Sequence, residues 1–391
     1  MMNNKRIPVL DIARGAAILG TLGTNIWLFA YLGNYEFLLG DPSDFYGTWE
    51  GITELFFVFF MNGKFLGLLT ILFGIGLEIK RRSYIRNGEE RYWPWLYVWG
   101  MMLLFIDGYL HYLFVFEFDV LMSYAVTGVI VAFLLSRKPG TIKGVAIGLG
   151  AVHLVIVGLL ALMMEVIFRF EEFRAEFVAE MQAVSAVYLN GTYADQVAMR
   201  FTDFWAMRFE AISIIPMNIL LFLFGVYLIR SGVFAATEEA RIRRRKMLFW
   251  GLGVGTVLNL LMFLPSYSAG IVVRYAFAPL MALGYLMAFY WLWEKRGSGF
   301  FFRRLSEVGR TALSCYMLQN IAASAIFYGW GLGLGGRLNA FEVIGVWTLI
   351  CAGMMLFAHL WLKKFPTGPF ELVWRWLIRL PVRGKEQRKA A

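Results

Sequence analysis

Long apolar stretches, separated by short polar and basic segments, repeat along the whole chain. A helix needs about 20 apolar residues to cross the hydrocarbon core of a bilayer, and about ten stretches approach that length. They lie near residues 9–32, 55–79, 93–115, 119–136, 142–168, 211–229, 247–265, 271–293, 308–328 and 341–362. The pattern predicts an all-α, polytopic integral membrane protein that forms a single domain over residues 1–391.

Composition and charge support this class and suggest an orientation. Hydrophobic residues make up 59% of the chain, charged residues 16%, and the mean hydropathy is +0.62, unlike ordinary soluble domains. Of the 37 Lys and Arg, 30 fall in alternate segments, namely 1–14, 80–92, 137–143, 230–246, 295–310 and 363–391. The positive-inside rule then predicts that both termini are cytosolic. The net charge of +10 reflects this topology, and no nucleic-acid partner is predicted.

Three segments depart from a simple series of crossings. Residues 62–64 interrupt the second stretch, which predicts an interfacial or re-entrant helix, a break, and then the crossing. Lys64 would snorkel to the interface, the commoner fate, or hold an anionic group. Residues 169–210 predict amphipathic extracytoplasmic helices that solvate a long connection, the favoured interpretation, or cover a site. Residues 363–391 predict a cytosolic interfacial helix and a basic tail.

A histidine and an aspartate flank a predicted turn in GYLHYLFVFEFDVLMSYAVTG, residues 108–128. Ionisable groups at membrane depth are costly unless they face a cavity or a partner, so His111 and Asp119 are candidate site residues. Asp107, one turn before His111, is a second potential partner. A hydrogen-bonded pair that only pins the hairpin is the alternative, since buried polar residues often serve packing between membrane helices.

The first predicted helix carries a second polar set. Asp11 and Arg14 are three residues apart and can pair, and Asn25 lies close to three turns after Arg14, on nearly the same stripe. A polar path into the membrane or tight helix packing would each explain the small residues of this helix. These are Gly15, Ala16, Gly20, Thr21, Gly23 and Thr24.

A third polar set occupies GRTALSCYMLQN, residues 309–320. Arg310 begins it, and Tyr316, Gln319 and Asn320 carry hydrogen-bonding groups deep into the ninth predicted span. So many polar groups in one span predict a polar interior.

Two further features of the sequence predict no catalytic role. Pro369 is placed to begin a helix near the C-terminus, on which Glu371 and Arg375 are four residues apart and are expected to pair. Cys315 and Cys351 both fall inside predicted spans, where they indicate neither a disulfide framework nor a metal site. No metal is predicted.

Five blocks of this sequence closely resemble, in order and spacing, the bacterial YeiB-like membrane family, classed as domain of unknown function 418. They are LDIARGAAILGTLGTN, KFLGLLTILFGIGLE, GYLHYLFVFEFDVLMSYAVTG, VGRTALSCYMLQNIAASAIFYGWGLG and FPTGPFELVWRWLIR. The resemblance covers nearly the whole chain. The YeiB-like proteins in turn resemble the transmembrane acyltransferase superfamily, which includes the lysosomal heparan-glucosaminide acetyltransferase. That superfamily moves an acyl group from cytosolic acyl-CoA to a hydroxyl or amine beyond the membrane.

The shared element with the acyltransferases is an LD-x-x-RG…N block in the first helix. It corresponds here to Leu10, Asp11, Arg14, Gly15 and Asn25. The heparan-type enzymes have a histidine shortly after this Asn, whereas no histidine precedes His111 in this chain. The resemblance therefore places the base at His111 or implies a different mechanism.

The leading prediction is a transmembrane acyltransferase that uses acyl-CoA, most simply acetyl-CoA, as co-substrate. His111, oriented by Asp119 or by Asp107, would deprotonate a hydroxyl or amine acceptor as general base. Asn25 would hold the thioester carbonyl or the developing oxyanion.

The remaining candidates divide between the two substrates. The CoA phosphates would meet a cytosolic set, with the pantetheine arm threaded along the small residues of the first helix. This set is Asp11, Arg14, Arg310 and Arg375. The candidates for binding a small-molecule, glycan or lipid-linked acceptor are Lys64, Tyr316, Gln319 and Asn320.

Two other functions use the same residues. A transporter or flippase for a small solute or lipid-linked molecule would bind its cargo or relay protons with these buried groups, although no convincing inverted repeat is visible. A non-catalytic membrane scaffold that binds lipids would leave the His111 and Asp119 pair unexplained. Membrane lipids are expected partners in every case, and a homodimer is compatible with the sequence.

Overall fold

The computed structural model describes residues 7–35, 42–297 and 299–390, and every regular element in these ranges is helical. The main helices are α1 (Pro8–Ala30), α3 (Trp49–Met61), α4 (Lys64–Arg86), α5 (Trp95–Phe114), α6 (Leu121–Leu134), α7 (Pro139–Ile167), α8 (Glu171–Asn190), α9 (Tyr193–Thr202), α10 (Phe204–Met207), α11 (Phe209–Ser213), α12 (Ile215–Arg230), α13 (Glu238–Leu248), α14 (Gly255–Asn259), α15 (Ala269–Val272), α16 (Ala278–Arg296), α17 (Phe300–Arg310), α18 (Ala312–Phe327), α19 (Ala340–Leu362) and α20 (Pro369–Ala390). Two π-helical segments, η3 (Phe249–Val254) and η5 (Val273–Phe277), join α13 to α14 and α15 to α16. Short 3₁₀ turns are η1 (Pro42–Phe45), η2 (Glu90–Tyr92) and η4 (Leu260–Phe263). The first six residues and the side chains of the basic tail at 381–391, both part of the predicted topology signal, lie outside this description.

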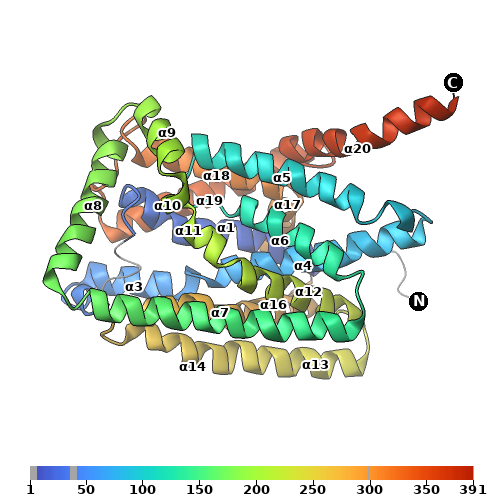
Figure 1. Cartoon of the computed structure of the whole chain (residues 1–391), viewed down its shortest axis with the longest axis horizontal. Coiled ribbons are helices and arrows are strands. Elements are labelled where there is room, and N and C mark those ends of the chain that lie inside the picture. The colour runs from blue at the N-terminus through green and yellow to red at the C-terminus, as the bar shows by residue number, and fades with distance from the viewer. Residues whose placement is uncertain (1–6, 36–41, 298, 391) are drawn as a thin grey trace.

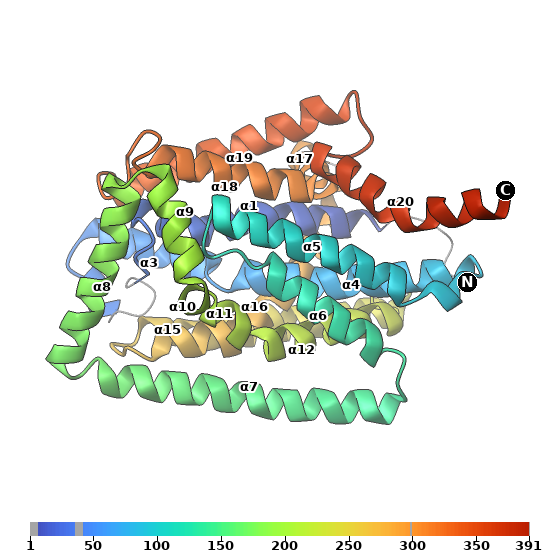
Figure 2. The same cartoon turned by 45° about the horizontal axis from the view of Figure 1, so that its top comes forward.

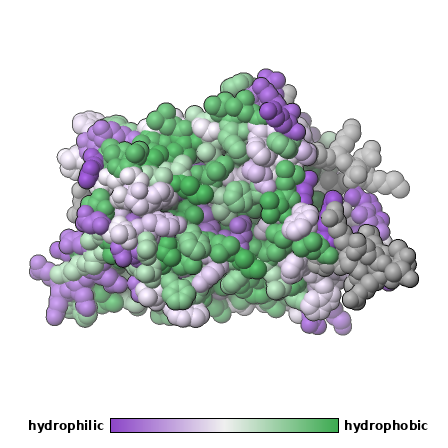
Figure 3. Space-filling view, turned by 90° about the horizontal axis from the view of Figure 1, so that it is seen from above, coloured by the Kyte–Doolittle hydropathy of each residue, from purple (hydrophilic) through white to green (hydrophobic). Residues whose placement is uncertain are grey.

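The long helices run mostly along the long axis of the molecule (Figures 1 and 2). Helix α8 stands across one end, and α20 projects from the other. The connections α4–α5, α6–α7 and α12–α13, which carry basic segments, lie at the α20 end. On the face seen in Figure 3, apolar residues cover most of the middle and hydrophilic residues gather toward the ends.

Helix lengths and hydropathy confirm an all-α, multi-pass membrane protein. Within the described residues, seven helical stretches are long and apolar enough to cross a bilayer. Three further predicted spans correspond to shorter apolar helices of 10–17 residues, α6, α12 and α18. The number of crossings and their sidedness therefore stay predictions.

Helix α1 forms the centre of the bundle and packs against α4, α17, α18 and α19. Two glycines let α1 and α17 touch backbone to backbone, because a Cβ on Gly15 would collide with Leu305 and Gly309, and one on Gly309 would collide with Asp11. This close approach requires the absence of a side chain at both positions.

Two other glycines of α1 are also covered by protein. A Cβ on Gly20 would collide with the ring of Phe65, and one on Gly23 would meet Met61 at 2.9 Å. There is therefore no room for a long thin ligand against these glycines, whereas Thr21 and Thr24 of the same helix line a cavity. Tight helix packing, the alternative interpretation, accounts for these glycines.

The predicted break after the first part of the second stretch is present. Helix α3 ends at Met61, and Gly63, with φ +73°, begins α4 in a left-handed conformation that favours glycine. The turn directs Lys64 into the protein, where it is fully buried and its Nζ lies 5.3 Å from the centroid of the Phe59 ring. Snorkelling of Lys64 to the interface, the favoured expectation, is therefore wrong.

Candidate functional site

Helix α1 runs past two cavities of very different size, of about 690 Å³ (the large cavity) and about 40 Å³ (the small cavity). From α1, the large cavity is lined by Asp11, Arg14 and Ile18, and the small cavity by Thr21, Thr24, Asn25 and Leu28. These positions recur mostly at helical spacing along one face of the helix. The large cavity therefore lies beside the beginning of α1, toward the α20 end, and the small cavity beside its end.

The large cavity is apolar inside and basic around it. Its apolar lining comes from α1, α4, α5, α6, α18 and α20 and includes Ile18, Leu69, Leu72, Phe73, Leu77, Met101, Leu104, Leu121, Leu313 and Trp374. Four cationic side chains from four different helices line it as well, namely Arg14, Lys80, Arg310 and Arg375. Arg14 Nη1 lies 3.2 Å from Asp11 Oδ1, which confirms the predicted pair. All four residues predicted to meet CoA thus line one cavity, and Lys80 joins them.

The predicted ion pair between Glu371 and Arg375 is wrong. Glu371 Oε1 instead accepts hydrogen bonds from the backbone N–H groups of Leu313 (2.8 Å) and Ser314 (3.3 Å), and Oε2 accepts one from Ser314 Oγ at 2.5 Å. Free N–H groups in the first turn of a helix attract a carboxylate, so Glu371 caps α18 from α20. Arg375 is left at the large cavity without an ion pair among the described residues.

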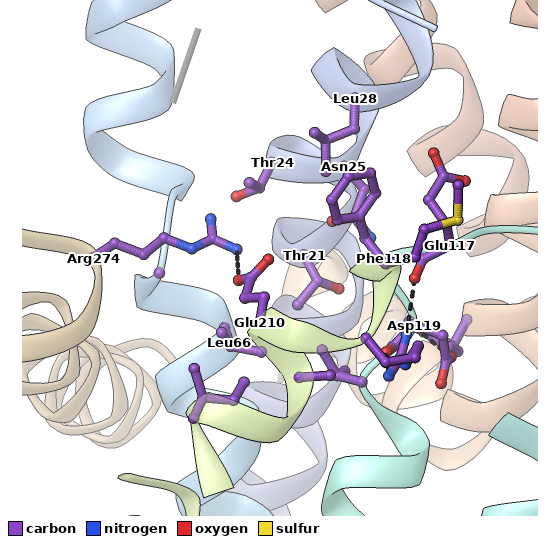
Figure 4. A pocket seen from close by; sticks show the side chains of 17 residues that line it. Thr21, Thr24, Asn25, Leu28, Leu66, Glu117, Phe118, Asp119, Glu210 and Arg274 are labelled. Atoms are coloured by element: carbon purple, nitrogen blue, oxygen red, sulfur yellow. Dashed lines mark hydrogen bonds and ion pairs between the residues drawn. The ribbon is translucent and has the colours of Figure 1, made fainter. Parts of the chain in front are cut away.

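The small cavity is lined by the aspartate of the predicted pair (Figure 4). His111 Nδ1 donates to Asp119 Oδ2 at 2.9 Å, and Tyr316 Oη donates to the same oxygen at 3.0 Å. The backbone N–H of Leu121 donates to Asp119 Oδ1 at 2.8 Å. Asp107, the second potential partner of His111, makes no hydrogen bond with it in the described part of the chain. The turn between α5 and α6 therefore presents a firmly held carboxylate.

His111 itself is buried and contributes to the lining of neither cavity. Its Nε2 lies 3.4 Å from Asn320 Nδ2 on α18. Gln319 Nε2 donates to the carbonyl of Ile18 at 3.1 Å and so ties α18 to α1. His111 reaches the small cavity only through Asp119, while Gln319 and Asn320 bond to other parts of the protein.

The end of the 169–210 segment, in α10 and α11, borders the small cavity. Arg208, 2% exposed, donates from Nη1 to the carbonyl of Glu117 (2.8 Å) and from Nη2 to that of Asp119 (2.5 Å). Met207, Arg208, Glu210 and Ala211 also line the cavity. The favoured interpretation of a merely solvated connection is therefore wrong for this part of the segment.

A second buried arginine anchors the same helices. Arg200 donates from Nε to Tyr188 Oη at 3.1 Å and from Nη1 to the carbonyl of Leu113 at 3.1 Å. Its Nε also lies 3.7 Å from Glu117 Oε2. Burial raises the pKa of Glu117 above its ordinary value, although Arg200 opposes this change.

An ion pair connects α11 to the interrupted helices on the other side of the small cavity. Arg274, in the π-helical segment η5, donates from Nη2 to Glu210 Oε1 at 2.8 Å and also contacts Asn62 at the α3–α4 break. Tyr275 Oη donates to the same Glu210 oxygen at 2.7 Å. Burial opposes ionisation of Glu210, but Arg274 and Tyr275 outweigh it and hold its pKa below the usual value. Figure 4 shows Glu210 and Arg274 facing Thr24 and Thr21 of α1.

Sequence reasoning missed several charged residues that line these cavities, Glu117 among them. Lys80 falls within the basic segment 80–92, which predicts a cytosolic loop. Arg208 and Arg274 lie outside the six basic segments that indicate the topology. Glu210 was one of several acids in an amphipathic segment. The available signal was that Arg208 and Arg274 lie away from the basic segments, beside or within apolar stretches, where an arginine needs a partner.

These apolar helices, enclosing charged groups around two internal cavities, define a multi-pass helical membrane protein with a polar interior. Residues 228–381 match the family model described as "Protein of unknown function (DUF418)". The chain is 28% identical to the uncharacterized protein YxaH of Bacillus subtilis, over 96% of this chain and 94% of the relative. It is 27% identical to the uncharacterized protein YeiB of Escherichia coli, over 95% and 96% respectively. The family match thus covers residues 228–381, and the similarity to YxaH and YeiB extends over nearly the whole chain. No solved structure matches it.

Proposed function

We propose that this protein is a transmembrane acyltransferase. It would move an acyl group, most simply acetyl, from cytosolic acyl-CoA to a hydroxyl or amine acceptor on the extracytoplasmic side of the bacterial inner membrane. The observation that carries the proposal is that a large basic cavity and a small polar cavity lie end to end along α1 and share the side chain of Tyr316.

The large cavity suits acyl-CoA in size and charge. Its volume of about 690 Å³ lies within the range of roughly 300–1,000 Å³ that is usual for ligand pockets. The phosphates of CoA are multiply anionic, and cations from four helices can form charge-assisted hydrogen bonds with them. The apolar lining matches the pantetheine arm and the acyl chain. Since the glycines of α1 are covered, this arm would lie along Leu69, Leu72 and Leu104 instead.

The small cavity suits the chemical step. Asp119 faces it, so the His111 and Asp119 pair would act as the base through the carboxylate, with His111 supporting it from behind. Asn25 also lines the cavity and can donate its amide N–H to the thioester oxygen as negative charge develops there. A cavity of about 40 Å³ admits the reacting group of an acceptor and little more, which favours group transfer over passage of a solute.

Binding of acetyl-CoA to the purified protein, measured by calorimetry in detergent, tests the large cavity. We expect Arg14→Glu and Arg310→Glu each to weaken binding by at least about tenfold, because phosphate contacts are charge-assisted. Arg241→Glu is the matched control, since Arg241 is exposed, pairs with its neighbour Glu238 and lines neither cavity. Unchanged affinity in both cavity variants would remove the proposed CoA site.

The orientation is tested by thiol labelling. Ala183 lies exposed on α8, and both native cysteines are buried, so a cysteine at position 183 would supply the accessible thiol. A membrane-impermeant maleimide should label Ala183→Cys in intact spheroplasts. Labelling only after the inner membrane is permeabilised would invert the topology and reject the proposed direction of transfer.

A further inference from the structure

The wall between the two cavities is built around one tyrosine. Tyr316 lies on α18, is 3% exposed, and is the one described residue that lines both the small and the large cavity. Its hydroxyl donates to Asp119 Oδ2 at 3.0 Å, and its ring centroid lies 5.1 Å from that of His111. The phenol is therefore bonded to the carboxylate of the small cavity while the side chain also borders the large cavity.

Acyl transfer between these cavities requires two proton transfers, one in each cavity. The acceptor loses its proton in the small cavity, where Asp119 is the carboxylate bonded to Tyr316. The thiolate of CoA departs in the large cavity and must gain a proton there. His111 does not connect the two sites, because its Nδ1 faces Asp119, its Nε2 faces Asn320, and it lines neither cavity.

We propose that Tyr316 carries the proton from the small cavity to the large one, an inference that rests on the proposed acyl transfer. The acceptor oxygen or nitrogen attacks the thioester carbon, and its proton passes to Asp119. The C–S bond breaks with its electron pair on sulfur, and sulfur takes the phenolic proton of Tyr316. Asp119 then returns its proton to the Tyr316 oxygen along their hydrogen bond. The products are the acylated acceptor and CoA thiol, and no proton is released outside.

The geometry distinguishes Tyr316 from other buried tyrosines. Tyr124 on α6 is equally buried, but its hydroxyl bonds to Thr70 at 2.9 Å and to the carbonyl of Leu66 at 3.3 Å, and its side chain lines neither cavity. Removing its hydroxyl removes a buried hydrogen bond of similar kind without touching the proposed proton path. Tyr124→Phe is therefore a matched control for Tyr316→Phe.

The test uses inside-out membrane vesicles that contain the full chain and receive [¹⁴C]acetyl-CoA, with vesicles lacking the protein as background. We expect Tyr316→Phe to slow incorporation of label into membrane material by about 10² to 10⁴, the usual contribution of a positioned proton donor. Acetyl-CoA affinity should stay within about threefold, and Tyr124→Phe should keep the wild-type rate. A Tyr316→Phe protein that incorporates label at the wild-type rate would overturn the proposal.

A second variant keeps the test decisive if loss of the hydroxyl disturbs folding. Incorporation of 3,5-difluorotyrosine at position 316 keeps the hydroxyl and nearly the same shape but makes the phenol more acidic. A proton carrier predicts a changed rate and a shifted pH profile of transfer, whereas a purely structural hydroxyl predicts neither. An unchanged rate and pH profile would reject the role of Tyr316. Absence of acetyl-CoA binding to the wild-type protein would instead reject the acyltransferase proposal itself.

Discussion

The large and small cavities hold their charges in opposite ways. Lys80, Arg310 and Arg375 line the large cavity without an ion pair among the described residues. In the small cavity, Arg208 is fixed by two backbone carbonyls and Arg274 by Glu210. Cations with spare hydrogen-bonding capacity suit a large anionic ligand that comes and goes. Charges fixed in advance suit a site where charge develops during a reaction, because little reorganisation is then needed.

This difference between the cavities also means that their cations contribute to different properties, ligand binding in the large cavity and stability in the small one. A guanidinium that fixes buried carbonyls contributes to the folded state, and its loss leaves those groups without partners. A cation on the wall of a large cavity has water as an alternative partner, and its loss affects mainly the ligand. Substitutions in the two cavities should therefore produce different measurable defects.

The largest expected effect is on turnover, from the small cavity. Asp119→Asn removes the carboxylate that faces the acceptor and should lower the rate of acyl transfer by about 10² to 10⁴. His111→Gln should lower it less, because His111 acts through Asp119. Acetyl-CoA affinity should hardly change in either variant. If His111→Gln proved more damaging than Asp119→Asn in the vesicle assay, the assignment of Asp119 as the facing group would be wrong.

The next effect is on stability. Arg208→Met leaves the carbonyls of Glu117 and Asp119 unsatisfied and should cost about 2–6 kcal/mol, at roughly 1–3 kcal/mol for each buried group. Thermal unfolding of the purified protein in detergent measures this loss. Arg241→Met, which removes an exposed pair, should change stability by less than about 1 kcal/mol. Equal melting temperatures for the two variants would contradict a structural role for Arg208.

The smallest effect is on affinity, from the large cavity. Lys80→Met should weaken acetyl-CoA binding by about tenfold or less, equivalent to at most about 1.4 kcal/mol, with melting temperature nearly unchanged. Raising the ionic strength should weaken wild-type binding in the same direction, because salt screens partly exposed charges. Calorimetry at low and high salt measures both effects. Salt-independent binding would show that phosphate contacts do not hold the ligand.

The class of fold could be predicted from the sequence because a chain with so many long apolar stretches is expected to cross the bilayer as helices of about 20 residues. The sequence also predicted the break at Gly63 and the pairing of His111 with Asp119, both of which depend on neighbours close in sequence. The wrong predictions concern side chains for which groups distant in sequence compete with near neighbours as partners. Glu371 has a neighbour four residues away, yet three donors on α18 bind it instead. No local pattern indicates that Lys80 and Arg375 line one cavity, since α20 reaches that cavity through its packing against α5 and α18.

The contact of Gly15 with Gly309 imposes an order on how the chain is made. Helix α1 leaves the ribosome before α17, because the helix that fits against its glycines follows nearly 300 residues later. At about 5–20 residues per second, α1 spends roughly 15–60 s in the membrane before α17 exists. During that time Asp11 and Arg14 on α1 have no large cavity to face. Until then α1 can pack against helices made in between, such as α4, so the last quarter of the chain completes a core that α1 begins.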